Sequence, residues 1–141
     1  MVEIIRAESE NEMKQVFEIR REVFIREQGV PEEIEFDELD SEAIHVLASV
    51  NGVTAGCGRL LLKDGNARIG RVAVRKDMRR GGIGDGICRL LMAIARDNGA
   101  EKVTINAQLT AVRFYESLGF EKEGEVFMEA GIDHVRMVRT L

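Results

Sequence analysis

The chain has 141 residues, of which 45% are hydrophobic and 32% charged, and its formal net charge is −5 at pH 7. This composition is typical of one folded domain spanning residues 1–141, and it excludes a disordered or collagen-like chain. The first residues lack the basic head and apolar run of a signal peptide, and no stretch approaches the length of a membrane span. We therefore expect a cytoplasmic protein with no membrane partner.

The two cysteines, Cys57 and Cys88, both stand in apolar surroundings. Their number and spacing fit neither a disulfide framework nor a zinc site, so we expect buried free thiols and no bound metal. Neither cysteine lies in a motif that suggests a nucleophile.

Acidic residues are concentrated in one segment. From Glu27 to Glu42 the chain carries many acids and no Lys or Arg, so the rest of the chain is slightly basic. Such a body could attract an anionic cofactor. No dominant basic face is indicated, and we expect no nucleic-acid partner.

The N-terminal part reads as a strand followed by a helix. Residues 2–7 read as a first strand, and Ser9 with Glu12 forms the S-x-x-E capping box of a helix start. Apolar residues then recur at helical spacing until Gly29 and Pro31, which predicts a helix ending near residue 27. The acidic segment follows as a loop with a short helical turn.

Three strands should come next as an antiparallel meander. Residues 44–50 alternate like a strand, Asn51-Gly52 marks a tight hairpin, and residues 53–63 form the partner strand. A second turn at 64–66 leads to a third strand over residues 67–74.

The C-terminal half alternates helices and strands. A basic link at 75–80 is followed by Gly81-Gly82-Ile83-Gly84-Asp85-Gly86, from which a helix with one apolar stripe runs to Asn98-Gly99. We expect a strand at 103–107, a short helix at 110–118, and final strands at 120–129 and 132–141.

The glycine-rich helix start is the first candidate site. Several backbone N–H groups and the positive end of the helix dipole point to one volume, which suits a phosphate, and Arg79 and Arg80 add charge. A turn that only reverses the chain is the alternative. The segment lacks the Gly-Lys-Ser/Thr of a P-loop, and Ile87 stands where a dinucleotide fingerprint needs its third glycine. The pattern that does fit is Arg79-x-x-Gly82-x-Gly84.

At this point the sequence resembles the GNAT superfamily of N-acetyltransferases, whose coenzyme A site uses Q/R-x-x-G-x-G/A at a helix start. Val72-Ala73-Val74 resembles the cofactor-binding strand of the family, and Phe114-Tyr115-x-x-x-Gly119-Phe120 resembles its later F-Y-x-x-x-G-F segment. The segments 20–27, 107–108 and 131–134 are similar to the small bacterial ElaA/YjcF-like branch. The resemblance implies an α+β fold: a mixed, mostly antiparallel sheet of six to seven strands, helices on both faces, and coenzyme A (CoA) entering where two central strands diverge.

The resemblance also implies a binding mode for acetyl-CoA as cosubstrate. Backbone N–H groups of the glycine loop would hold the pyrophosphate, main-chain groups of the preceding strand would pair with the pantetheine arm, and an asparagine would bind a pantetheine amide. The implied cofactor residues are Val72, Ala73, Val74, Arg79, Arg80, Gly81, Gly82, Ile83, Gly84, Asn106 and Tyr115.

Tyr115 occupies the position that, in the family, donates a proton to the departing CoA thiolate. Its alternative role is that of an amphipathic core tyrosine. The family has no fixed base to take the proton of the attacking amine. We rank His134 above Glu129 because an imidazole titrates near neutral pH, and His45 and the acidic-segment carboxylates remain further candidates.

Within the acidic segment, Glu35, Asp37 and Asp40 are candidates for binding a cationic amine, although charge runs are often only solvated loops. The expected function is direct transfer of an acetyl group from acetyl-CoA to a primary amine of a small molecule or peptide, in a ternary complex. The alternative is a non-catalytic CoA-binding regulatory or interaction module. A homodimer is one arrangement that the sequence leaves open.

Overall fold

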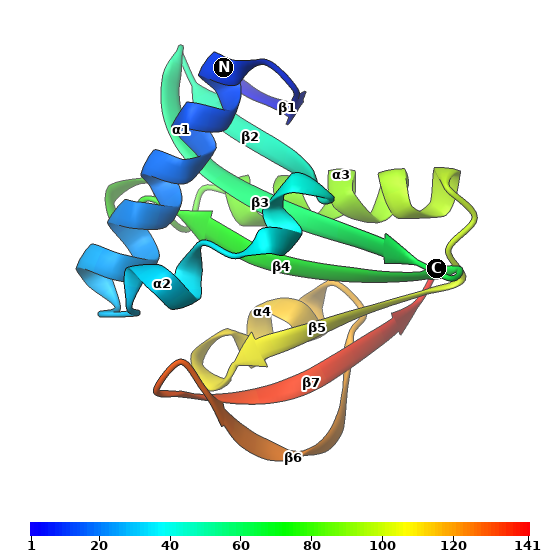
Figure 1. Ribbon diagram of the computed structural model, residues 1–141. Coiled ribbons are helices and arrows are strands. Elements are labelled where there is room, and N and C mark those ends of the chain that lie inside the picture. Colours follow the sequence, from blue (N-terminus) through cyan, green and yellow to red (C-terminus); the bar gives the residue numbers. More distant parts are fainter.

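One seven-stranded sheet runs through the molecule in the order β1-β2-β3-β4-β5-β7-β6 (Figure 1). The computed structural model describes all residues from 1 to 141. Every neighbouring pair is antiparallel except β4 and β5, which are parallel. The predicted mixed, mostly antiparallel sheet is thereby confirmed. Its strands are β1 (Val2–Ala7), β2 (Ile44–Val50), β3 (Val53–Lys63), β4 (Asn66–Val74), β5 (Lys102–Gln108), β6 (Glu121–Glu129) and β7 (Ile132–Thr140).

The helices lie close to their predicted positions, with one difference. The capping box of Ser9 and Glu12 starts α1, but the helical stretch changes at Arg21 into a π-helix, whose wider turns carry Val23 and Phe24 to a cavity wall. No helix has the length and apolar character needed to cross a membrane. The helices are α1 (Glu10–Arg20), π-helix η1 (Arg21–Glu27), α2 (Glu32–Glu35), α3 (Ile83–Asp97), α4 (Val112–Ser117) and the 3₁₀ turns η2 (Glu38–Ser41), η3 (Lys76–Met78) and η4 (Leu109–Ala111).

Helices cover both faces of the sheet, as predicted. Because successive strand residues point to opposite faces, β2 contributes Val46 to the core under α3 and Leu47 to the core under α1. The α3 core contains the fully buried Ile87 and Leu91, while Val16 anchors α1. Two apolar layers therefore hold the sheet between α1 and α3 (Figure 1).

Two glycines let α3 lie very close to the sheet. A Cβ at Gly58 would come within 2.7 Å of Ile87 and 2.8 Å of Leu91, and one at Gly86 would come within 2.5 Å of Ile4. Side-chain Cβ atoms do not tolerate such distances. At Gly58 the close packing of α3 therefore requires glycine, whereas at Gly86 the nearest atom is the end of the flexible Ile4 side chain, which can move aside.

The parallel strands β4 and β5 separate halfway along their length (Figure 1). Their paired residues end at Ile69 and Ile105, although β4 continues to Val74. The pairing of β3 with β4 shifts register in the same region, and Arg71 has a φ of +52°. Such a bulge bends the strand locally. Beyond Ile69, the edge of β4 that faces β5 is therefore unpaired.

Candidate active site

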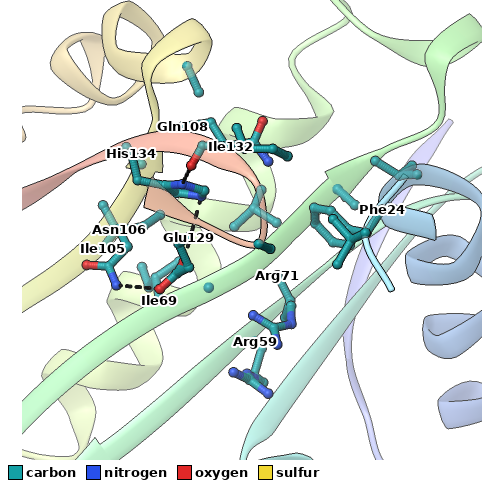
Figure 2. Close-up of a pocket in the computed structure, with 18 of the residues that line it drawn as sticks. Phe24, Arg59, Ile69, Arg71, Ile105, Asn106, Gln108, Glu129, Ile132 and His134 are labelled. Atoms are coloured by element: carbon teal, nitrogen blue, oxygen red, sulfur yellow. Dashed lines mark hydrogen bonds and ion pairs between the residues drawn. The ribbon is translucent and has the colours of Figure 1, made fainter. Parts of the chain in front are cut away.

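A cavity of about 580 Å³ lies where β4 and β5 diverge (Figure 2). This volume is typical of a small-ligand site. Its walls come from η1, the segment with α2, the strands β3, β4 and β5, and the turn between β6 and β7. Segments far apart in the sequence thus meet at the open edge of β4.

The glycine-rich loop forms one end of this region, and its backbone donors are free. None of the N–H groups from Arg79 to Asp85 donates a hydrogen bond within the protein. Gly82 serves as N-cap of α3 with a φ of +82°, and it offers no side chain to cap the helix. Free N–H groups at a helix start favour an anion.

The guanidinium of Arg79 has protein partners rather than a free face. It donates two hydrogen bonds of 2.7 Å to the Glu27 carboxylate, and its Nε donates to the Val74 carbonyl at 2.8 Å. These bonds tie the loop to η1 and to the end of β4. Arg80, by contrast, makes no ion pair and is exposed. Of the two arginines, only Arg80 keeps a side chain free for a phosphate.

The predicted pantetheine site is also on the cavity wall. Val72, Ala73 and Val74 line the cavity along the unpaired edge of β4, and Asn106 lines it from β5. An extended ligand could pair with such an edge as an added strand.

Tyr115 lies at the base of the cavity on α4. Its side chain is 6% exposed, and its ring packs edge-on against Phe114 and Phe120 at centroid distances of 4.9 and 5.8 Å. The hydroxyl makes no hydrogen bond within the protein, yet it is not among the fully buried unpaired atoms. Burial raises the pKa of Tyr115 well above its ordinary value. The phenol therefore stays protonated and its donor is available.

His134 and Glu129 face each other across the turn between β6 and β7 (Figure 2). His134 Nδ1 lies 2.7 Å from the Ile132 carbonyl, which assigns the Nδ1–H tautomer to the neutral ring and leaves Nε2 as an acceptor. That Nε2 is 3.7 Å from Glu129 Oε2, while Glu129 Oε1 accepts from Asn106 Nδ2 at 3.3 Å. The structure thus brings three predicted site residues together on one wall.

His45, another candidate base, lies elsewhere. Its Nε2 is 2.9 Å from the Asp40 carbonyl, and it does not line the cavity. Burial lowers the pKa of His45. This histidine packs against Phe17 at a centroid distance of 6.3 Å and has no access to a reacting amine.

The acidic segment folds onto three arginines that the sequence analysis did not single out. Arg20 is fully buried and binds Glu35 at 2.8 Å and Asp40 at 2.7 Å. Glu35 and Asp37 line the cavity, whereas Asp40 does not. All three predicted carboxylates therefore have arginine partners. We call this group the arginine–carboxylate cluster; it comprises Arg20, Arg59, Arg71, Glu35, Asp37 and Asp40.

Burial and charge act against each other in this cluster. Burial raises the pKa of Glu35 despite its arginine neighbours. For Asp40, burial alone would also raise the pKa, but hydrogen bonds and charges from Arg20 and Arg59 outweigh it and leave the pKa lowered.

One sequence signal for this cluster exists: Arg59 is the only charged residue between Val53 and Leu62 in an otherwise apolar strand.

Two glutamines of the cavity wall are hydrogen-bonded to each other. Gln108 Nε2 donates to Gln28 Oε1 at 2.8 Å, which joins the end of β5 to the residue after η1. This contact crosses 80 positions of sequence, and no local pattern indicates it.

Both cysteines are buried away from the cavity, and burial raises the pKa of each thiol to about 12. Thiols held in this form are poor nucleophiles.

Comparison with known proteins identifies the fold and the family. Residues 5–141 match the family model described as an acetyltransferase (GNAT) domain. The uncharacterized N-acetyltransferase YjcF of Bacillus subtilis is 39% identical over 137 residues, covering 94% of this chain and 96% of YjcF. The crystal structure of Escherichia coli ElaA superposes with a TM-score of 0.87 at 26% identity, covering 99% of both chains.

A second structure, a Bacillus subtilis acetyltransferase in complex with CoA, has a TM-score of 0.76 at 19% identity and covers 100% of this chain and 99% of that chain, which is a likeness of fold. The resemblance to the ElaA/YjcF-like branch is confirmed. With its diverging central strands, its free glycine-loop donors and these relatives, the chain belongs to the GNAT acetyltransferase family.

Proposed function

We propose that this acetyltransferase transfers the acetyl group of acetyl-CoA directly to a primary amine, with both substrates bound in the diverging-strand cavity. The observation that carries the proposal is the run of unpaired backbone N–H groups from Arg79 to Asp85, beside a cavity that Tyr115 also lines. The N–H groups can bind a pyrophosphate, and Tyr115 can contact the reacting atoms.

The cofactor would lie along the open edge of β4. The N–H groups from Arg79 to Gly84 would bind the pyrophosphate, with Arg80 adding charge, because that anion needs several donors at close range. Main-chain groups of Val72 to Val74 would pair with the pantetheine arm, and Asn106 would bind one of its amides. The CoA complex of the Bacillus subtilis structural neighbour supports this placement at the level of the fold.

The chemistry then requires one proton donor and one proton acceptor. The amine nitrogen attacks the thioester carbon, the bond from carbon to sulfur breaks, and the sulfur leaves as a thiolate. A backbone N–H at the open edge of β4 would stabilise the charge on the carbonyl oxygen. The Tyr115 hydroxyl would protonate the thiolate, since burial keeps that hydroxyl in its protonated form.

For the proton acceptor, His134 is the better candidate of the two on the cavity wall. Its Nε2 lone pair is free because Nδ1 is committed to the Ile132 carbonyl. The Ile132 carbonyl would orient the ring, and Glu129, whose Oε2 lies 3.7 Å from Nε2, would stabilise the imidazolium that forms.

Direct transfer is favoured over an acetyl-cysteine intermediate. Neither Cys57 nor Cys88 lines the cavity, and thiols with a pKa of about 12 carry almost no thiolate at neutral pH.

Binding of a cationic amine by Glu35, Asp37 and Asp40 stays a prediction. The geometry gives better support to a positioning role, because each carboxylate already holds at least one arginine. Because arginine charges already balance the carboxylates, the carboxylates would orient the arginines rather than attract a cationic substrate.

Calorimetric titration with acetyl-CoA, ATP and NAD tests the cofactor site. Acetyl-CoA should bind, and the other two should not. A thiol-release assay with a panel of amines then tests turnover. If acetyl-CoA does not bind, the proposal fails; if it binds and no amine releases thiol, the protein is the non-catalytic CoA-binding module. The unbonded Tyr115 hydroxyl at the cavity favours the enzyme.

A further inference from the structure

The acceptor side of the cavity carries two guanidinium groups whose hydrogen-bonding capacity is only partly used. Arg59 comes from β3 and Arg71 from the bulge in β4, and Figure 2 shows them next to each other. One carboxylate joins them, because Asp37 Oδ1 accepts from Arg59 Nη1 at 2.8 Å and Oδ2 accepts from Arg71 Nη2 at 3.2 Å. The two side chains are therefore held as one unit.

Several donors of this unit have no partner. Arg59 uses only Nη1, which donates to Asp37 and Asp40 at 2.8 and 2.9 Å. Its Nε is buried without a hydrogen bond, in a residue that is 4% exposed, and its Nη2 donates none. Arg71 uses Nε and Nη2, and its Nη1 donates none. The Nε atom is enclosed by protein, whereas Nη2 of Arg59 and Nη1 of Arg71 are not among the fully buried unpaired atoms, so these two donors are the ones that a ligand in the cavity can reach.

The position of these donors relates them to the reacting centre. Arg59 is paired with Gly70, the first residue of β4 beyond its last pair with β5, and Arg71 directly precedes the predicted pantetheine-binding residue Val72. Both arginines therefore lie at the point where the open edge of β4 starts. They line the same cavity as Tyr115 and His134.

The charge of the unit selects the kind of anion. The arginine–carboxylate cluster has three arginines and three carboxylates, so its formal charges cancel. It offers fixed donors without surplus positive charge, which suits a singly charged carboxylate better than a dianionic phosphate. Ile34 and Leu39, 48% and 36% exposed, line the same cavity and offer an apolar surface.

We propose that the acetyl acceptor is an amine that also carries a carboxylate, an amino acid with an apolar body, and that Arg59 and Arg71 bind its carboxylate. The inference rests on the proposed acetyl transfer. The acidic segment alone suggested that the site binds a cationic group of the substrate, whereas this proposal has the site bind an anionic group. The carboxylates of the segment position the arginines, and the arginines bind the substrate carboxylate.

The test compares amines that differ only at the carboxylate. Leucine, leucinamide and isoamylamine are assayed by thiol release. Two further amines are included: 3-aminopropylphosphonate carries a phosphonate in place of the carboxylate, and 4-aminobutyrate has a longer chain between its amine and its carboxylate. Leucine should have a kcat/KM at least about tenfold above leucinamide and isoamylamine, because its carboxylate accepts hydrogen bonds from charged donors. Equal or faster turnover of the neutral amines, or preference for the phosphonate, would overturn the proposal while leaving acetyl transfer intact.

Arg59→Lys separates substrate binding from folding. A lysine Nζ can still reach Asp37 and Asp40, as Arg59 Nη1 does, but the unpaired Nε and Nη2 donors are lost. The variant should lower the ratio of kcat/KM for leucine to kcat/KM for isoamylamine by about tenfold, with unchanged acetyl-CoA affinity. Arg71→Lys should act in the same direction. Arg6→Lys, on β1 and away from the cavity, is the matched control.

A binding measurement keeps the proposal testable without turnover. N-acetylleucine, titrated by calorimetry into the CoA-loaded protein, should bind, and Arg59→Lys should weaken that binding. N-acetylisoamylamine should bind less tightly. Absence of N-acetylleucine binding would overturn the carboxylate site, whereas absence of CoA binding would overturn the proposed function itself.

Discussion

Tyr115→Phe removes one oxygen atom and keeps the ring, and its expected effect can be worked out from the contacts of that ring. The Tyr115 ring packs edge-on against Phe114 and Phe120, and phenylalanine can keep both contacts. The hydroxyl has no hydrogen bond to lose. The free energy of unfolding should therefore change by less than about 1 kcal/mol.

The effect on turnover should be much larger. If the hydroxyl protonates the departing thiolate, its loss should lower kcat by about 10²–10⁴, which raises the barrier by about 3–5 kcal/mol. Burial raises the pKa of Tyr115, so the wild-type enzyme should show no alkaline loss of activity from this group below about pH 10. The thiol-release assay at saturating acetyl-CoA measures kcat, and calorimetry should show an unchanged CoA affinity.

Phe120→Leu is the matched control. Phe120 is 2% exposed and touches the Tyr115 ring, so the variant should lower the melting temperature more than Tyr115→Phe does and kcat less. A Tyr115→Phe enzyme with kcat within about threefold of wild type would refute the proton-donor role.

Three further predictions follow from other parts of the site. His134→Gln should abolish the rise of kcat/KM with pH that deprotonation of the base produces, and an unchanged pH–rate profile would exclude the histidine. Gly82→Ala should raise the Kd of acetyl-CoA and cost about 1 kcal/mol of stability, because the φ of Gly82 is +82°; Gly81→Ala, whose Cβ would meet nothing nearer than 3.9 Å, should leave both quantities close to wild type. Burial raises the Asp40 pKa less than its arginines lower it, so this carboxylate stabilises the fold above the ordinary carboxyl pKa near 4 and the contribution is lost as the pH falls through the lower folded value. Urea midpoints measured from about pH 6 down to about pH 2 should show that acid loss in the wild type, and Asp40→Asn should flatten it.

Much of the fold could be predicted because its signals are local. The capping box at Ser9 and the Asn51-Gly52 turn act within a few residues, and the structure shows both where expected. The divergence of β4 and β5 has no such signal in the residues themselves. The prediction of this divergence came from the resemblance to the GNAT family, and the comparisons confirm that the chain belongs to that family.

The arginine–carboxylate cluster shows why the acceptor side was harder to predict. Arg71 reaches the backbone of Glu35 across 36 positions, and Arg20 reaches Asp40 across 20. A run of acids on its own resembles a solvated loop, and only the fold supplies the partners that neutralise it. The π-helix was not predicted, because its 7 residues are too few for the wider i→i+5 turn to show in the apolar spacing.

The close contact of α3 with the sheet has a consequence for how activity can be lost. Gly58 lies outside the cavity lining and far in sequence from the free N–H groups, yet a methyl group at this position would collide with Ile87 and Leu91 and push α3 away from the sheet. The donors from Arg79 to Asp85 belong to the first turn of that helix and the loop before it, so a lifted helix would carry them away from the open edge of β4. The distance between the glycine-rich loop and the open edge of β4 is thus fixed by Gly58, a residue outside the cavity.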